Sequence, residues 1–200
     1  MAGRILIVMI IPAILLFLII SSLTGTDRFD LLTDPGIQIT PFCDADEKGK
    51  STVDGFSSDN GRIVFRYTLR KSDRIPYAGI TFKKNTPIDL SPYDVIRLKI
   101  RSTSSSALKI VVYAYVEGVT SQSKPLSYAY LTQNIRVPRN GKDCDLDISM
   151  LRIPDWWYTF NNLKLHDERV RIDLSSVDRL TIENGDMDGA EITNSVSIDG

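Results

Sequence analysis

The sequence predicts an all-β fold, an antiparallel β-sandwich, preceded by one apolar N-terminal helix. Apolar and basic residues alternate strictly from Ile96 to Arg101, which is the period of a strand with one buried face. Similar short runs recur along the chain, and Gly, Pro, Ser and Asn separate them. No convincing amphipathic helix follows the first 25 residues. A chain of 200 residues suits one such domain plus a short extra segment.

Residues 1–25 predict a transmembrane anchor or a signal segment. An apolar run from Ile5 to Leu23 follows a single positive charge at Arg4. About 19 helical residues rise about 28 Å, close to the hydrocarbon thickness of a bilayer. Acidic residues follow the run, which favours an N-terminus inside the cell and a domain exported to the periplasm or the exterior. A cleaved signal peptide is the alternative, and it also places the domain outside the cytoplasm.

Residues 26–42 predict a linker, because Pro35-Gly36 and Pro41 interrupt any regular pattern. We expect the sandwich over residues 43–200. Its strands are predicted at 63–69, 79–82, 95–100, 108–116, 126–137, 179–183 and 195–199.

Composition argues against two classes of function. Basic and acidic residues nearly balance, 24 against 25, and they are scattered, so a nucleic-acid partner is not expected. His166 is the sole histidine, and the sequence has neither a Gly-x-Ser-x-Gly elbow nor a glycine-rich phosphate loop. We therefore predict that the chain is not an enzyme.

Several short motifs occur in a distinctive order from Pro76 onward. They are Pro76-Tyr77-Ala78-Gly79-Ile80, Ile88-Asp89-Leu90-Ser91, Trp156-Trp157, Asp173-Leu174-Ser175 and Ser195-Val196-Ser197-Ile198-Asp199. This order resembles the galactose-binding-like jelly rolls of carbohydrate-binding modules and complex-I intermediate-associated proteins. The resemblance covers about residues 43–200 and implies the fold more directly than the function. In such domains the last motif continues as the closing strand, so we expect that strand to be truncated at Gly200 and the protein to be longer.

Tyrosines on two successive predicted strands form the candidate ligand site. Tyr113 and Tyr115 share one face of their strand, and Tyr128 and Tyr130 share one face of the next. A hairpin would bring all four onto one surface, where aromatic rings could stack on sugars. Two further residues complete the predicted ligand-binding set, Trp157 and Arg97. The alternative is that the tyrosines stabilise neighbouring strands through cross-strand contacts.

An acidic loop suggests a structural calcium ion. The resemblance implies a site between such a loop and the last strand, here Asp44 and Asp46 with Asp199. Carboxylate oxygens suit this ion. The alternative is a solvated acidic loop, and no other cofactor is predicted.

The two cysteines, Cys43 and Cys144, suggest a disulfide, because an even pair is typical of an exported domain. Two independent free thiols are the alternative.

Together these features predict a module outside the cytoplasm that binds a carbohydrate or a similar small polar ligand. The N-terminal segment would attach it to the membrane as the sensory domain of a bacterial receptor, with a downstream signalling domain or protein partner. The alternative is a structural or protein-interaction sandwich, an assembly factor or scaffold, without a small-molecule ligand.

Overall fold

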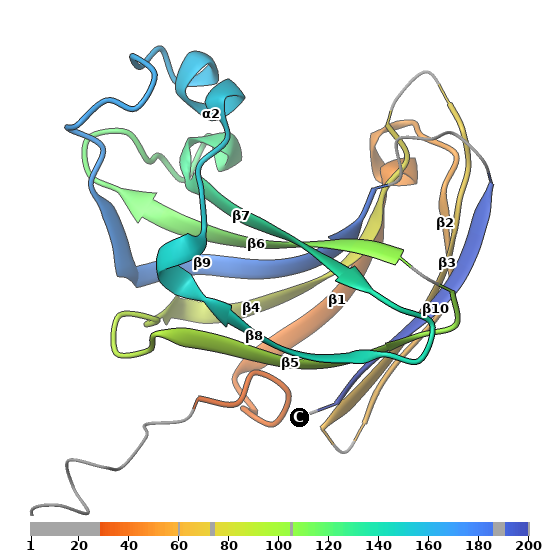
Figure 1. Ribbon diagram of the computed structural model, residues 1–200. Coiled ribbons are helices and arrows are strands. Elements are labelled where there is room, and N and C mark those ends of the chain that lie inside the picture. Colours follow the sequence, from red (N-terminus) through yellow and green to blue (C-terminus); the bar gives the residue numbers. More distant parts are fainter. Residues whose placement is uncertain (1–28, 60, 73–74, 105, 186–190, 200) are drawn as a thin grey trace, which may run out of the picture.

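The computed structural model describes residues 29–59, 61–72, 75–104, 106–185 and 191–199, and within them two five-stranded antiparallel sheets pack face to face (Figure 1). Sheet A has the order β1-β4-β9-β6-β7, with β1 (Ile37–Cys43), β4 (Ala78–Ile88), β9 (Ile172–Asn184), β6 (Ser106–Val116) and β7 (Ala129–Val137). Sheet B has the order β2-β3-β10-β5-β8, with β2 (Thr52–Asp59), β3 (Arg62–Leu69), β10 (Ile192–Asp199), β5 (Val95–Ser102) and β8 (Lys142–Asp147). The prediction of an all-β antiparallel sandwich is confirmed.

Period-two alternation builds the core between the sheets. On β5, Ile96, Leu98 and Ile100 are buried, whereas the intervening basic side chains are exposed. The inner faces of both sheets contribute to one continuous apolar cluster, as expected when each strand has one buried side.

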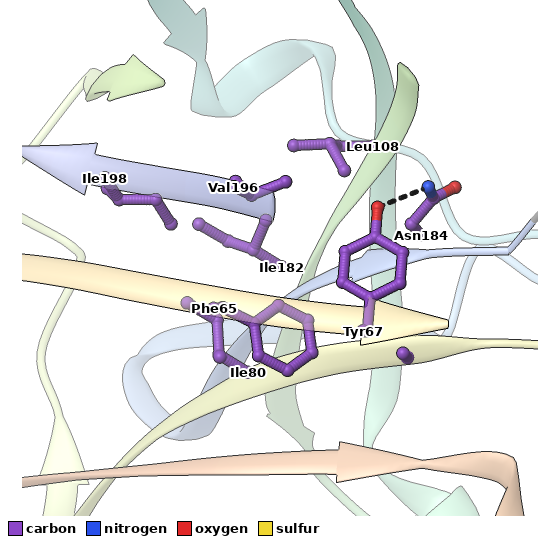
Figure 2. A pocket seen from close by; sticks show the side chains of 9 residues that line it. Phe65, Tyr67, Ile80, Leu108, Ile182, Asn184, Val196 and Ile198 are labelled. Carbon is purple, nitrogen blue, oxygen red and sulfur yellow. Dashed lines mark hydrogen bonds between the residues drawn. The ribbon is translucent and has the colours of Figure 1, made fainter. Parts of the chain in front are cut away.

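One buried polar network also joins the two sheets (Figure 2). Asn184 of β9 donates a hydrogen bond of 2.7 Å from Nδ2 to the hydroxyl of Tyr67 on β3. Asn194 of β10 donates a second, of 3.1 Å, to the same oxygen. A cavity of about 10 Å³ lies beside Tyr67, which is about the space of a single water molecule. The core is therefore nearly filled here.

Two Asp-Leu-Ser motifs form the same turn. The carboxylate of Asp89 accepts hydrogen bonds from the N–H and the hydroxyl of Ser91, at 2.9 and 2.7 Å. Asp173 does the same for Ser175, at 2.9 and 2.6 Å. These are Asx turns, in which an aspartate replaces a backbone acceptor. The similarity between the two segments therefore reflects shared turn chemistry.

The predicted linker over 26–42 is wrong in its last third, because β1 pairs with β4 along its whole length. Pro41 is tolerated there because β1 is an edge strand, where a missing N–H breaks no essential ladder bond. Strands β2 and β8 also went unpredicted. The same holds for the helix α2 (Asp155–Phe160) and three short 3₁₀ helices, η1 (Asp44–Glu47), η2 (Pro125–Ser127) and η3 (Ile148–Met150).

The last motif of the sequence forms β10, which lies inside sheet B. It pairs with β3 from Ile192 to Asp199 and with β5 over Val196 to Asp199. The last motif is therefore an interior strand of sheet B.

The predicted anchor over residues 1–25 lies outside the described residues. Within the part of the chain that the structure describes, no helix is long and apolar enough to cross a membrane.

Candidate functional site

The face of sheet A that is turned away from sheet B carries three rows of side chains, which run across the strands. We call it the outer face. The strand register gives the rows as Gln38-Lys83-Arg179-Tyr113-Tyr130, Thr40-Thr81-Thr181-Val111-Thr132 and Phe42-Gly79-Glu183-Lys109-Asn134. The middle row has only small side chains, whereas the flanking rows carry most of the aromatic and charged groups. This arrangement places rings and charges around a central strip of small residues.

Three aromatic side chains form a cluster at one end of these rows. The rings of Tyr113 and Tyr130 meet edge to face, with centroids 5.3 Å apart. Trp156, from α2, packs against Tyr130 at the same centroid distance. Trp156 is 45% exposed, whereas Tyr113 is only 9% exposed. We call these three residues the aromatic cluster; it offers an indole ring to solvent on a base of packed tyrosines.

Charged side chains surround the aromatic cluster. The guanidinium of Arg179 lies 3.8 Å from the ring centroid of Tyr113. Glu183 Oε1 accepts a hydrogen bond of 2.7 Å from the Tyr130 hydroxyl and forms an ion pair with Lys109 Nζ, also at 2.7 Å. Because these groups hold one another in position, the polar atoms beside the rings are preorganised.

Burial extends the pH range over which the two tyrosine hydroxyls stay neutral. It is the main cause that raises the pKa of Tyr130, and the neighbouring carboxylate of Glu183 raises it further. Burial also raises the pKa of Tyr113, again with a contribution from Glu183. A neutral phenol can donate and accept hydrogen bonds, whereas a phenolate only accepts. The Tyr130 hydroxyl already donates its proton to Glu183, so toward a sugar it can act as an acceptor.

The structure brings together two of the predicted ligand-binding tyrosines, Tyr113 and Tyr130, which lie directly opposite each other. Tyr115 is 37% exposed and lies on β6 beyond this pair, opposite Asp173 of β9. Tyr128 is half-buried just before β7, and its carbonyl accepts a hydrogen bond from an indole N–H. Of the four tyrosines predicted to share one surface, two, Tyr113 and Tyr130, pack against each other.

The predicted role of Trp157 is wrong. Its side chain is fully buried, and Nε1 donates a hydrogen bond of 2.6 Å to the carbonyl of Tyr128. The neighbouring Trp156 is the exposed ring instead. In a helix, adjacent residues point in directions about 100° apart, so the two indoles must differ in environment.

The structure separates Arg97 from the predicted tyrosines. Arg97 lies on β5 of sheet B, where it forms a bidentate ion pair with Asp145, at 2.7 and 2.8 Å. Arg97 is therefore on a different sheet from the aromatic cluster.

The predicted disulfide is wrong, because Cys43 and Cys144 are both free and buried. Cys43 ends β1, an edge strand of sheet A that lies beside β2, whereas Cys144 is on β8, at the other edge of sheet B. Cys43 Sγ donates a weak hydrogen bond of 3.4 Å to the carbonyl of Ser51. Burial raises the pKa of the Cys144 thiol.

The predicted set of calcium ligands is not brought together. Asp44 in η1 is fully buried, and its Oδ1 accepts the N–H of Ser51 at 2.8 Å. Ser51 lies at one end of sheet B, whereas Asp199 pairs with Arg62 at the other end, six residues or about 20 Å along β3. Among the described residues, no three acidic, histidine or cysteine side chains are grouped to hold a metal. The residues therefore do not fit the predicted site, although one oxygen of Asp44 is buried without a partner.

Four residues of the site were missed in the sequence, namely Trp156, Arg179, Glu183 and Lys109. The strand predicted at 179–183 already placed Arg179 and Glu183 on one face, opposite Leu180 and Ile182. The sequence does not reveal that this strand pairs with the strand of Tyr113, and this pairing places Arg179 beside Tyr113.

The chain matches no protein-family model and no curated protein sequence. Solved structures that are similar in fold include two carbohydrate-binding modules. A family 11 carbohydrate-binding module from Clostridium thermocellum, in complex with a β-1,3-1,4-mixed-linked tetrasaccharide, has a TM-score of 0.52 and 13% identity over 86% of this chain and 94% of that module. The family 11 module of a cellulosomal cellulase from the same organism has a TM-score of 0.50 and 15% identity, over 86% of this chain and 91% of its own. The resemblance to galactose-binding-like jelly rolls is thus confirmed at the level of the fold.

Proposed function

We propose that this chain is a non-catalytic carbohydrate-binding module that holds a glycan on the outer face of sheet A. The aromatic cluster carries this proposal, because Trp156 is solvent-exposed and fixed against Tyr130. An exposed indole on a rigid base can stack on the apolar face of a sugar ring at little entropic cost.

The charges around the cluster supply the second element of sugar recognition. Arg179, Glu183 and Lys109 present donors and acceptors of fixed geometry next to the rings. Binding sites generally combine apolar surface with a few positioned polar groups, which determine orientation and specificity. The fold shared with modules of family 11 supports this proposal, and the tetrasaccharide bound to one of them suggests the first ligand to test.

A glycan array probed with the full chain, followed by calorimetry with the mixed-linked tetrasaccharide, tests the proposal. Both are run with calcium and again with a chelator, because the predicted calcium dependence is separate from the glycan site. Saturable binding to a defined glycan class supports the module. Lack of binding by a folded sample contradicts it, and binding that is unaffected by the chelator agrees with the separation of Asp44 from Asp199.

We also propose a cellular location for the module. The apolar run from Ile5 to Leu23 would hold it on the membrane outside the cytoplasm, where polysaccharides occur. Glycan binding could then be reported to a downstream signalling domain. Alkaline phosphatase fused after residue 200 should be active in a bacterial host if the domain is exported, and an inactive fusion of normal abundance would contradict export.

One observation favours a protein-interaction module as the second candidate. Large apolar side chains are exposed on and around α2, among them Phe160 and Leu165, each 55% exposed, and Leu126, 43% exposed. Exposed apolar patches are typical of protein-docking surfaces. This candidate predicts that glycan arrays are negative and that Leu165→Asp abolishes binding to a protein partner.

A further inference from the structure

A second site lies between the two sheets, on the opposite side of sheet A from the aromatic cluster. The first described residues, Phe29 to Leu32, lie below β5 in Figure 1. Together with β5 they line a pocket of about 530 Å³. This volume is within the usual range for pockets that bind small molecules. Its inner wall is apolar and comes from both sheets, through Phe82, Ile110, Leu180 and Ile182 of sheet A and Ile96, Leu98 and Ile198 of sheet B.

Specific contacts define the mouth of this pocket. The rings of Phe29 and Tyr93 lie 6.4 Å apart, and both rings line the opening. Lys84 fixes the segment that carries Phe29, through an ion pair of 2.8 Å with Asp34 and through its ammonium group, 5.5 Å from the Phe29 ring centroid. The opening is therefore formed by packed side chains.

The pocket is long as well as apolar. One wall follows β5 from Val95 to Lys99, which is four residue steps or about 13 Å. Protein interiors are normally filled to the density of organic crystals, and the cavity of about 10 Å³ beside Tyr67 is an example. An open apolar space of this length therefore suits an apolar occupant.

Charged residues also line the pocket, namely Asp30, Asp94, Arg97, Lys99 and Asp199, and those on β5 belong to the exposed face of the strand. A molecule inside would therefore meet hydrocarbon on the inner wall and a charged, hydrated rim along the outer edge. We propose that the pocket binds the hydrocarbon chain of an amphiphile, a fatty acid or one acyl chain of a phospholipid, with the polar end at the rim.

Photo-crosslinking of the full chain tests this proposal. In one arm the probe is free palmitic acid with a diazirine near the end of its chain; in the other it is a phospholipid with the same acyl group, presented in phosphatidylcholine vesicles. We expect saturable labelling of peptides that contain residues 29–32 and 90–98. Labelling in the first arm alone identifies a free fatty acid, and labelling in the second identifies a membrane lipid. Labelling that is absent from these peptides in both arms, or that does not saturate, overturns the proposal.

A pocket-filling variant makes the test specific. Leu98→Phe adds bulk to the open space, so it should leave the melting temperature nearly unchanged and reduce labelling about tenfold. Ile100→Phe is the matched control, because Ile100 is buried on the same face of β5 but does not line the pocket. Its extra bulk should lower the melting temperature more than Leu98→Phe does.

If Leu98→Phe does not fold, Leu32→Trp narrows the mouth from the half-buried N-terminal segment and serves the same purpose. Undiminished labelling in a folded variant that fills or narrows the pocket would overturn the proposal. Glycan binding should be unchanged in both variants, because the aromatic cluster lies on the other side of sheet A. The two proposals therefore fail independently.

Discussion

Replacing Trp156 by alanine should weaken glycan binding about tenfold. A fully accessible tryptophan side chain presents about 250 Å², so the 45% that is exposed here corresponds to about 110 Å². A sugar ring that covers half of this area removes about 55 Å² from water, which is worth about 1.4 kcal/mol at about 25 cal/mol per Å². That energy is a factor of about ten in Kd.

The same change should cost little stability. Trp156 contributes one edge-to-face contact with Tyr130, and such a contact is worth about 0.5–1.5 kcal/mol. Calorimetry gives the Kd for the mixed-linked tetrasaccharide, or for the best glycan on the array, and thermal denaturation confirms that the variant is folded.

Phe160→Ala is the matched control for this experiment. Phe160 is 55% exposed and lies on the same helix, but its ring is not among those that contact the aromatic cluster in the described part of the chain. We expect its loss to leave the Kd nearly unchanged. An unchanged Kd in Trp156→Ala, or equal losses in the two variants, would refute the role of the aromatic cluster.

Three further predictions concern stability. Tyr67→Phe removes the hydroxyl that joins the sheets and leaves buried amide groups without a partner, so urea denaturation should show a loss of about 1–3 kcal/mol; a neutral effect would contradict the network. Because Cys43 and Cys144 are free, reductant should not shift the melting temperature, and thiol titration of the denatured protein should find both thiols; a shift would restore the disulfide. The raised pKa of Tyr130 means that the folded state retains this proton above pH 10, where the unfolded chain loses it. Stability from this group is therefore complete below about pH 10 and declines above it, and Tyr130→Phe should flatten that decline in denaturation curves measured from pH 9 to 11.5.

The sequence predicted strands best where one face is apolar and the other is charged. Val95 to Arg101 is the clearest case, and the structure gives it the expected inner and outer faces. Strands β1, β2 and β8 were missed for physical reasons, because they lie nearer the sheet edges, where fewer side chains are buried and polar residues and prolines are tolerated. The fourth edge strand, β7, was predicted because apolar residues recur along it.

The candidate site was harder to predict, because it depends on contacts between distant segments. The pairing of Tyr113 with Tyr130 follows from a local hairpin, and the sequence suggested it. Arg179 reaches the same place only because β9 inserts between β4 and β6, which no local pattern reveals. The prediction took Trp157 for the exposed indole, whereas Trp156 is exposed. This error has a similar cause, since the orientation of a short helix is set by the surface on which it packs.

The central position of β10 in sheet B has a consequence for the order of folding. Without residues 192–199, β2-β3 and β5-β8 would be two separate two-stranded ribbons, and isolated ribbons of this kind are marginally stable in water. During synthesis, sheet B therefore cannot assemble until residue 199 has left the ribosome. Because this step pairs β10 with segments about 100 residues away or more, we expect the domain to fold slowly and cooperatively, with chain closure as its rate-limiting event.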